Sequence, residues 1–195
     1  MRTKTSTDYK GWSLDLIKEI EWKRLEELCL WLFEYKGFSS ELTESTHDEG
    51  IDVKLFHNSH EEGKNPIGLI QCKQHKNPVS ANLIREFIFV LRQQNVISGI
   101  FVSTSGFGKK AQLIAKQEPK YRLQLWDDEK LLNEILRLEV HFQEELYEKT
   151  IEGDYTVPTC VRCNIKLVER TNGSTKKKFW GCNTPRCQVT MNARS

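Results

Sequence analysis

"DEGIDVKLF", residues 48–56, and "IGLIQCK", residues 67–73, are two strand-like stretches that carry polar side chains where a buried strand would exclude them. Asp52 interrupts the first apolar run, while Gln71 and Lys73 close the second. Alternate side chains of a strand share a face, so Gln71 and Lys73 project together. If the strand of Asp52 lies beside the other, a carboxylate, a carboxamide and an ammonium group converge at one spot.

That convergence suits hydrolysis of a phosphodiester. We expect Asp52 to bind a hard divalent cation, Mg²⁺ or Mn²⁺, with the backbone carbonyl of Cys72 and the side-chain oxygen of Gln71 as further ligands. The metal would polarise the scissile phosphate, and Lys73 would position or deprotonate the attacking water. Two alternatives stay open: a lysine at a strand end is often a solvated tip, and Asp48 competes as a metal ligand, although its place before Gly50 fits a turn.

Glu26 lies within a stretch, residues 13–36, that is expected to form one long helix. At helical spacing its neighbours are apolar, so the carboxylate would stand in an apolar stripe. Burying it unpaired would cost several kcal/mol. We therefore predict that Glu26 reaches the metal site, directly or through water. The alternative is a helix-edge acid paired with a lysine or arginine.

Strands and helices alternate along most of the chain, which predicts an α/β domain with a mixed sheet flanked by helices. A tail (1–12), a nuclease domain (13–148), a linker (149–158) and a cysteine module (159–193) are the expected units. Helices are expected at 13–36, 80–94, 106–117 and 127–148, and strands at 38–44, 51–56, 67–73, 96–105 and 121–126.

A family resemblance rests on these same residues. "DEGIDV", the 18-residue gap after Asp52 and then "QCK" resemble the catalytic core of Mrr-like restriction endonucleases, a branch of the PD-(D/E)XK nucleases in which glutamine replaces the usual acid. "EWKRLEELCLWLFEYKGF" is similar to the family's opening helix, with Glu26 at its helical glutamate, and "GIFVSTSGFGKKA" to a later strand and helix. The resemblance spans about residues 20–145. It implies a restriction-endonuclease-like fold and Mg²⁺-dependent DNA cleavage by Asp52, Gln71 and Lys73. No stretch resembles the winged-helix region of full-length Mrr proteins, so specificity for methylated DNA does not carry over.

"STSGFGKK", residues 103–110, places Lys109 and Lys110 at an expected helix start. Backbone N–H groups there can cradle a phosphate. The stretch lacks the G-x-x-x-x-G-K-[ST] pattern, so we expect a DNA backbone contact and not a nucleotide-triphosphate site. The histidines, scattered through loops, show no spacing typical of metal ligands.

Four of the six cysteines form a metal-binding pattern. Cys160, Cys163, Cys182 and Cys187 are spaced C-x2-C, an 18-residue gap, then C-x4-C. Two such pairs can bind one tetrahedral Zn²⁺, which would stabilise a segment too short for a core of its own. Two disulfides are the disfavoured alternative in a cytosolic chain. The remaining cysteines, 29 and 72, are expected to be small buried side chains.

"KKKFWGCNTPRC" resembles the C-terminal zinc ribbon of bacterial type I DNA topoisomerases, which implies binding of single-stranded DNA. A ribbon of this kind could offer phosphate-binding charge and stacking surface from Lys176, Lys177, Lys178, Phe179 and Trp180. The alternative is that one or both aromatic rings pack the ribbon's small core.

Charge is distributed unevenly. Residues 154–195 hold eight Lys or Arg and two acids, a net +6, while residues 1–153 hold 21 and 25, a net −4. A zinc ion with four thiolates adds −2 and leaves the module near +4, which favours a polyanionic partner. No apolar run approaches the roughly 18 residues of a membrane span, and the N-terminus lacks the apolar region of a signal peptide. We therefore expect a cytoplasmic protein without a membrane partner.

Together these patterns predict a two-module DNA endonuclease with a catalytic α/β core and a DNA-holding zinc ribbon. Alternatives are an inactive DNA-binding or DNA-end-sensing protein on a nuclease fold, and a junction-resolving repair nuclease. Cutting both strands commonly requires two active sites, which favours a homodimer, although no motif identifies its interface.

Overall fold

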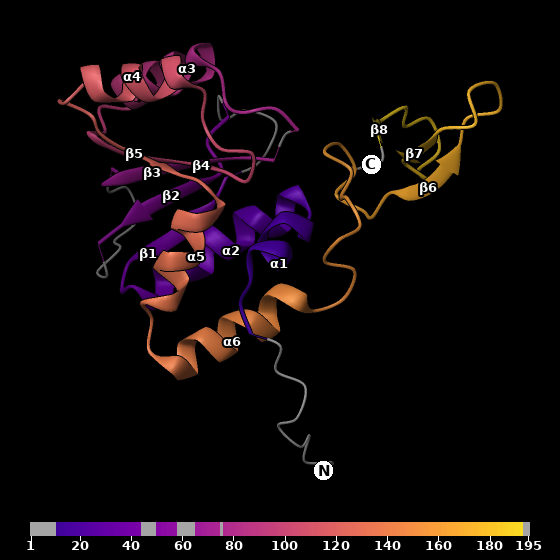
Figure 1. Ribbon diagram of the computed structural model, residues 1–195, viewed down its shortest axis with the longest axis horizontal. Coiled ribbons are helices and arrows are strands. Elements are labelled where there is room, and N and C mark those ends of the chain that lie inside the picture. Colours follow the sequence, from indigo (N-terminus) through magenta and orange to yellow (C-terminus); the bar gives the residue numbers. More distant parts are fainter. Residues whose placement is uncertain (1–10, 44–49, 58–64, 75, 193–195) are drawn as a thin grey trace.

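A five-stranded sheet forms the centre of the structure. The computed structural model describes residues 11–43, 50–57, 65–74 and 76–192 (Figure 1). The sheet order is β1-β2-β3-β4-β5, antiparallel between the first three strands and parallel between the last three. The expected mixed α/β fold is thus confirmed. The strands are β1 (Ser39–Leu42), β2 (Val53–Phe56), β3 (Gly68–Lys73), β4 (Ser98–Ser103) and β5 (Arg122–Trp126).

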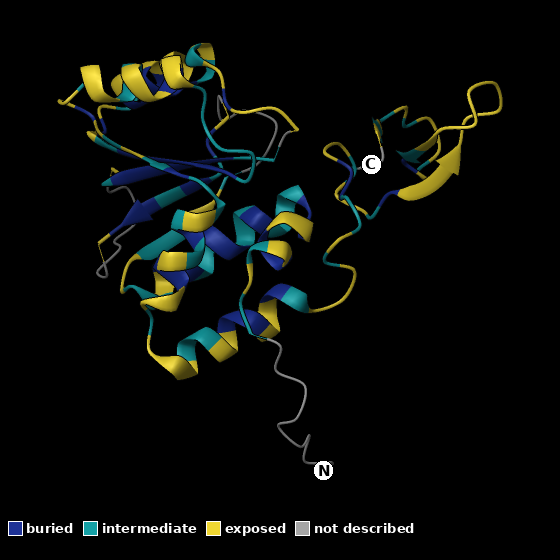
Figure 2. Ribbon diagram, in the orientation of Figure 1, coloured by how far each residue is buried: buried dark blue, intermediate teal, exposed yellow. Residues whose placement is uncertain are grey.

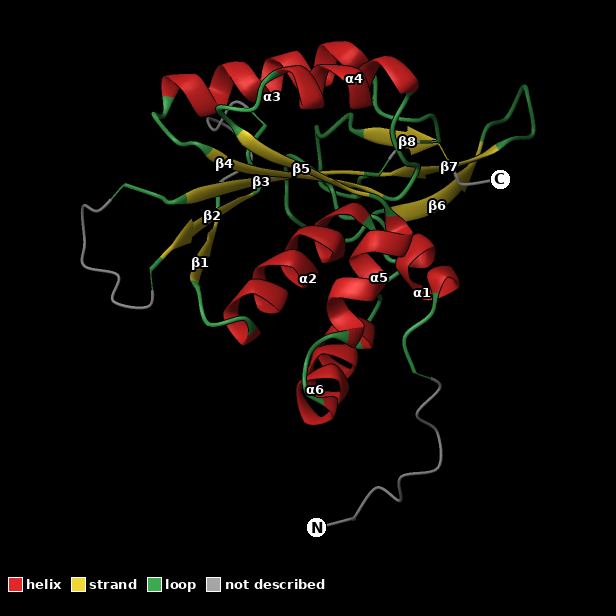
Figure 3. Ribbon diagram, turned by 60° about the vertical axis from the view of Figure 1, so that its left-hand side comes forward, coloured by secondary structure: helices red, strands yellow, loops and turns green. Residues whose placement is uncertain are grey.

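Helices cover both faces of this sheet, and the inner strands are correspondingly buried on both sides (Figures 2 and 3). In β4, Ile100 and Val102 join the core on the face of α2 (Trp22–Tyr35), whereas Phe101 joins the core under α3 (Ala81–Gln93). A continuous apolar run is what a strand buried on both faces requires. One face carries α1 (Leu14–Glu19), α2 (Trp22–Tyr35), α5 (Asp128–Leu136) and α6 (Val140–Ile151), and the other carries α3 (Ala81–Gln93) and α4 (Lys109–Gln117).

The single helix expected over residues 13–36 is wrong, because the backbone is extended at Ile20 and Glu21. Ser13 caps α1 as its sequence position suggests, and its hydroxyl accepts a hydrogen bond from the N–H of Leu16. Glu21 then caps α2, accepting from the N–H of Lys23 at 3.1 Å. The N–H of Glu21 donates to the carbonyl of Tyr155 at 2.8 Å, a distant partner that replaces a helical one.

The single helix expected over residues 127–148 is also wrong. It divides into α5 and α6 around Arg137–Glu139. The carboxamide of Gln143 donates to the carbonyls of Leu136 and Leu138, so it satisfies acceptors that the end of α5 leaves open.

The segment expected to be a polar linker, residues 149–158, is packed against the domain. Helix α6 continues to Ile151, and Tyr155 lies against the core on the face of α2. A small antiparallel sheet follows, in the order β6 (Val168–Thr171), β7 (Lys178–Gly181) and β8 (Thr190–Asn192). Its buried residues are few, centred on Cys160, Leu167 and Cys182. Among the residues that the structure describes, no helix is long and apolar enough to cross a bilayer.

Glu134 on α5 fastens this helix to the end of α2. Its buried carboxylate pairs with Lys130 at 2.7 Å and with Lys36 and Arg137. Burial alone would raise its pKa, but the hydrogen bonds from Lys130 and Lys36 lower the pKa from 4.5 to about 2.

We predict that Glu134→Gln lowers the free energy of unfolding at pH 7 by about 1 to 2 kcal/mol, a modest loss because Lys130 and Arg137 are partly exposed. A depressed pKa stabilises the fold above the ordinary value of 4.5 and ceases to do so as pH falls through about 2. Urea titrations should therefore show the deficit shrinking between pH 4.5 and 2. Glu139→Gln, at an exposed acid beside His141, is the control. An equal loss in both variants would contradict the role of Glu134.

Candidate active site

The candidate site lies where β2 and β3 separate. Val53 pairs with Ile70, and the N–H of Asp52 donates to the carbonyl of Ile70 at 3.0 Å. At the next position on that edge, the N–H of Cys72 donates to the carboxylate Oδ2 of Asp52 at 2.6 Å. A side chain thus replaces the backbone partner, and this charge-assisted bond fixes the carboxylate at the sheet edge.

Glu26 of α2 meets Asp52 in this position, since the two carboxyl groups share a hydrogen bond. Burial, the charge of Asp52 and that hydrogen bond raise the pKa of Glu26 to about 9. Burial also raises the pKa of Asp52 to about 6, against the lowering effects of the Cys72 N–H and the charge of Lys73. Near neutral pH the pair therefore holds one proton, carried by Glu26. The structure gives Glu26 an acidic partner, Asp52, and the charge of Lys73 also acts on it.

Lys73, at the end of β3, is partly buried, and its charge lowers the pKa of both Asp52 and Glu26. Gln71, two residues earlier, is buried, and its carboxamide lies against Gly50. A Cβ at position 50 would stand 2.7 Å from Nε2 of Gln71, and the backbone there has a φ of +86°. Only glycine meets both demands, so Gly50 leaves the space that Gln71 occupies.

Two further residues hold the site, and the sequence analysis missed both. Thr43 follows β1, where its N–H donates to the carbonyl of Asp52 at 3.1 Å and its hydroxyl donates to that of Ile51. Gln74 donates from its carboxamide to the carbonyl of Ile20, between α1 and α2. The position of Gln74 directly after Lys73 was the available signal.

Several oxygen atoms that could bind a metal lie at this edge of the sheet. The N–H and C=O of one strand residue point the same way, so the carbonyl of Cys72 faces the side from which Asp52 accepts. The thiols of Cys72 and Cys29 are 3.6 Å apart in the core on the face of α2, which confirms that both are interior side chains. A carboxylate, a backbone carbonyl and a second acid are the ligand types of a hard cation such as Mg²⁺ or Mn²⁺.

The predicted DNA-backbone contact lies at the start of α4. Lys109 and Lys110 begin α4, on the sheet face opposite α2, and both are exposed. The loop before them is fixed by the N–H of Gly108 donating to the carbonyl of Val79 at 3.0 Å. Asp48, the competing metal ligand, lies outside the described residues.

Four cysteines converge in the C-terminal module. The sulfur atoms of Cys160, Cys163, Cys182 and Cys187 all lie within 4.8 Å of one another, and all four thiols are free. The sulfurs of Cys160 and Cys187 are 3.8 Å apart. Four sulfurs at about 2.3 Å from one zinc would be separated by roughly 3.8 Å in a tetrahedron, whereas a disulfide requires about 2.05 Å.

Backbone groups around the cluster favour thiolates. The N–H of Cys163 points to the sulfur of Cys160 at 3.4 Å, and the N–H of Thr184 to that of Cys182 at 3.4 Å. Hydrogen bonds from the Thr184 side chain and backbone lower the pKa of Cys182 to about 6. At Cys187 the Val189 N–H also lowers the pKa, but burial and the neighbouring cysteines outweigh it and raise the pKa to about 12. Thiolates are the form that binds a metal, so the chemistry of this donor set fits zinc.

The two aromatic residues of β7 have different surroundings. Trp180 packs against the cysteine cluster, in agreement with the alternative that one of the two rings packs the small core of this module. Phe179 is its neighbour on the strand and faces the other way, partly exposed. Lys176 and Lys177 are exposed in the turn before β7, and Lys178 pairs with Glu169 at 2.7 Å. The hairpin therefore offers exposed lysines at its turn and a partly exposed ring, Phe179, on β7.

An α/β core with acids and a lysine at a diverging strand edge is typical of metal-dependent nucleases. Residues 17–135 match the restriction endonuclease family Mrr_cat, and the chain belongs to this family.

The chain is also similar to individual proteins. It is 26% identical over 122 residues to the uncharacterized protein y4cE of Sinorhizobium fredii (strain NBRC 101917 / NGR234), covering 62% of this chain and 31% of that protein. Among solved structures it resembles the MspJI restriction endonuclease in complex with a 27-mer oligonucleotide (18% identity, TM-score 0.46, 72% of this chain and 34% of the other). It also resembles the DNA modification-dependent restriction endonuclease AspBHI (14% identity, TM-score 0.48, 72% and 39%). The chain thus spans about a third of the length of these relatives.

We predict that Glu26→Gln stabilises the protein at alkaline pH in the absence of Mg²⁺. A carboxyl whose pKa rises from 4.5 to about 9 on folding stabilises the fold below pH 4.5, and this contribution is lost as pH rises through 9. Glutamine has no proton to lose, so the variant should gain about 1 to 3 kcal/mol over wild type between pH 5 and 9, measured by urea unfolding. Glu27→Gln, on the same helix but paired with Arg24, should show no such gain. A pH-independent difference for Glu26→Gln would be inconsistent with the buried acid pair.

Proposed function

We propose that this protein is a divalent-metal-dependent DNA endonuclease that hydrolyses phosphodiester bonds. The carrying observation is the edge of β3, where Asp52 is fixed by the N–H of Cys72 beside Glu26 and Lys73 in a chain of the restriction endonuclease family. Burying two acids together destabilises a fold unless a cation completes their surroundings. The free-energy cost of burying Glu26 beside Asp52 is explained if a cation binds at this edge.

Each residue has a distinct role in this proposal. Asp52, the carbonyl of Cys72 and the side-chain oxygen of Gln71 would hold Mg²⁺ or Mn²⁺, with Glu26 reaching it directly or through water. The bound ion supplies Lewis acidity toward the scissile phosphate and an acidified water. Glu26 must give up its proton when the cation binds, since its protonated form cannot act as an anionic ligand. Lys73 orients the water and offsets negative charge on the transition state.

The experiment is cleavage of supercoiled, linear and single-stranded DNA with Mg²⁺, Mn²⁺ or no divalent cation. We predict that Asp52→Asn and Lys73→Ala each lower the cleavage rate by at least about a hundredfold, because both remove interactions made with the transition state. DNA affinity should change little, since neither residue contributes bulk charge.

Lys54→Ala is the matched control, a lysine on β2 that lies opposite Leu69 in the ladder. Full activity in the Asp52 or Lys73 variant would refute the assigned site. DNA binding by the wild type without cleavage under any cation would instead favour the inactive, DNA-sensing alternative.

We also infer that the cysteine cluster binds one structural Zn²⁺ and that the ribbon grips DNA. Its four sulfurs all lie within 4.8 Å of one another, one pair at 3.8 Å, which supports a tetrahedral site, and reduced thiols fit the cytoplasmic location expected from the sequence. The hairpin turn with Lys176 and Lys177 would contact phosphates, and Phe179 on β7 would stack on a base. The same substrate panel, extended by branched DNA, tests which DNA forms are cut. It also tests whether a homodimer cuts both strands.

Point variants test this grip better than truncation, because the ribbon supplies partners to a buried carboxylate of the core, Glu21. We predict that replacing Lys176, Lys177 and Lys178 together by Gln weakens DNA binding and lowers the slope of log affinity against log salt. Each lost phosphate contact should reduce that slope by about 0.9 on duplex or about 0.7 on single strands. Fluorescence anisotropy across a salt series measures both quantities.

The control replaces Lys116 and Lys120, at the end of α4 and after it, by Gln. If the ribbon variant binds every DNA form with unchanged affinity and slope, the ribbon does not grip DNA.

A further inference from the structure

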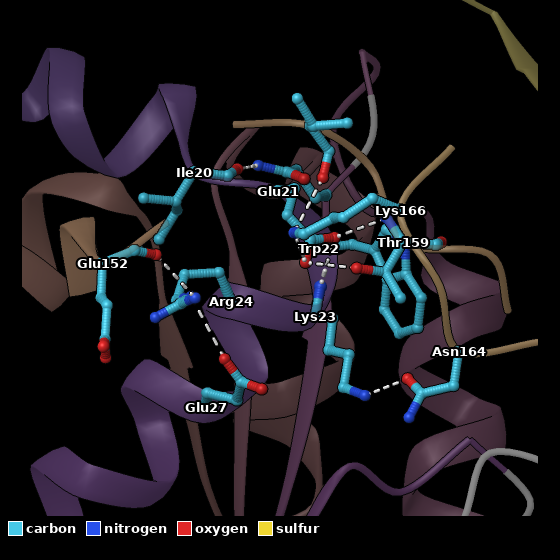
Figure 4. Close-up of polar contacts among 12 residues, drawn as sticks. Ile20, Glu21, Trp22, Lys23, Arg24, Glu27, Glu152, Thr159, Asn164 and Lys166 are labelled. Atoms are coloured by element: carbon cyan, nitrogen blue, oxygen red, sulfur yellow. Dashed lines mark hydrogen bonds and ion pairs between the residues drawn. The ribbon is translucent and has the colours of Figure 1, made fainter. Parts of the chain in front are cut away.

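Glu21 is a carboxylate enclosed between the nuclease core and the ribbon, with only 2% of the residue exposed. One oxygen, Oε1, accepts from the hydroxyl of Thr159 at 2.9 Å and from Nζ of Lys166 at 3.2 Å. The other, Oε2, accepts from the N–H of Thr159 at 3.2 Å and from that of Lys23 at 3.1 Å. Figure 4 shows these groups converging on Glu21. Three of the four donors therefore belong to the C-terminal segment.

The donors from the ribbon frame its first cysteine pair. Thr159 directly precedes Cys160, and Lys166 follows Cys163 by three residues. Thr159 and Lys166 face each other across an antiparallel bridge, closed by the N–H of Cys160 donating to the carbonyl of Ile165 at 2.8 Å. We call residues 159–166 the cysteine turn. A metal that holds Cys160 and Cys163 fixes this turn, and with it both residues that bind Glu21.

Two neighbours of Glu21 extend the contact. The indole N–H of Trp22 donates to the carbonyl of Thr159 at 2.9 Å, and Nζ of Lys23 donates to the side chain of Asn164 within the cysteine turn. The first turn of α2 is thus bonded to the cysteine turn through three successive residues (Figure 4).

The same segment of the core continues into the candidate active site. Glu21 caps α2, and Glu26, the partner of Asp52, lies five residues further along that helix. The carbonyl of Ile20, on the other side of Glu21, accepts from Gln74, which follows Lys73. Residues 20–26 therefore contact the cysteine turn through Glu21, the residue after β3 through Ile20, and the residue before β2 through Glu26.

We propose that Glu21 is a positioning residue through which the metal-bound cysteine turn orders the start of α2 and so places Glu26 in the nuclease site. If the cysteine turn loosens, the carboxylate of Glu21 keeps only one of its four hydrogen-bond donors, the N–H of Lys23. It is then a charged group that is nearly inaccessible to water. That state is unfavourable, so the cap opens and the first turn of α2 frays. The ribbon is then a structural part of the nuclease as well as a DNA grip.

Amide hydrogen exchange on the full chain tests the coupling without relying on activity. In the zinc-loaded wild type, exchange at residues 20–26 should be slow, and removal of zinc by a chelator should raise it by at least about tenfold, since hydrogen bonds to a charged group are lost. Glu21→Ala should show the fast exchange with zinc still bound, and chelation should add little. Glu27→Gln, on the same helix and paired with Arg24, should behave like wild type.

Lys166→Met approaches the same contact from the ribbon and serves if Glu21→Ala does not fold. It removes the ammonium partner of Glu21 and leaves all four cysteines, so exchange at residues 20–26 should rise while one zinc per chain is retained by elemental analysis. Unchanged exchange at 20–26 after chelation, with changes confined to residues 159–187, would overturn the proposal. Unchanged exchange at 20–26 in zinc-bound Lys166→Met would overturn it too.

The catalytic consequence rests on the proposed nuclease function. Glu21→Ala should lower kcat about tenfold or more with little change in KM for DNA, because Glu26 is misplaced while the ribbon's DNA-binding face is intact. Glu21→Gln, which keeps an acceptor oxygen in the same shape, should recover part of that loss. Coupled exchange in a protein that cleaves no DNA would refute the nuclease and leave the coupling standing. If the wild type cleaves DNA but its amide exchange at residues 20–26 is the same with and without zinc, the coupling alone is refuted.

Discussion

The hydrogen bond between the N–H of Cys72 and the carboxylate of Asp52 is the interaction around which the candidate site is organised. β2 and β3 pair as an antiparallel ladder as far as Asp52 and Ile70, and there the backbone partners run out. A buried N–H needs an acceptor, and Asp52 supplies one from its side chain. Because a side chain takes the place of a backbone acceptor here, a carboxylate lies at the sheet edge beside the carbonyl of Cys72. The same carboxylate is the hydrogen-bond partner of Glu26.

The cost of this arrangement is electrostatic and is concentrated in the acid pair. Two carboxyl groups share one proton near neutral pH because burial disfavours a second charge more than Lys73 can offset it. Elsewhere the same fold treats a buried acid differently: Glu134 is surrounded by Lys36, Lys130 and Arg137 and stays ionised. The contrast separates an acid that fastens two helices together from the acid pair that we propose binds a cation.

The ribbon and the core are joined by hydrogen bonds and an ion pair at Glu21. The ribbon's own core is small, so its order depends on the cysteine cluster, and the core's Glu21 depends on donors from the cysteine turn. Each part completes the other's hydrogen bonding. Segments that are separated by more than 130 residues in the chain thus share one buried charge, and neither can be described fully without the other.

The sequence alone determined those features that depend on local period and spacing. The alternation in "IGLIQCK" placed Gln71 and Lys73 on one face, and the apolar stripe around Glu26 marked that acid as unusual. The mixed α/β fold followed from the order of the elements. The spacing of four cysteines was enough to expect that they converge, as their sulfurs do.

Tertiary structure decided whatever depends on partners that are distant along the chain. Helical periodicity runs through Ile20 and Glu21, yet the helix breaks there because Tyr155 and Thr159 offer those backbone and side-chain groups better partners. "DEG" reads as a turn, but only the packed site shows that the missing Cβ of Gly50 makes room for Gln71. Phe179 and Trp180 are both aromatic, and only the position of the cysteine cluster shows which ring packs against it. Periodicity reports which face of an element is apolar, whereas the hydrogen-bond partner of a polar group is chosen only when the chain has folded around it.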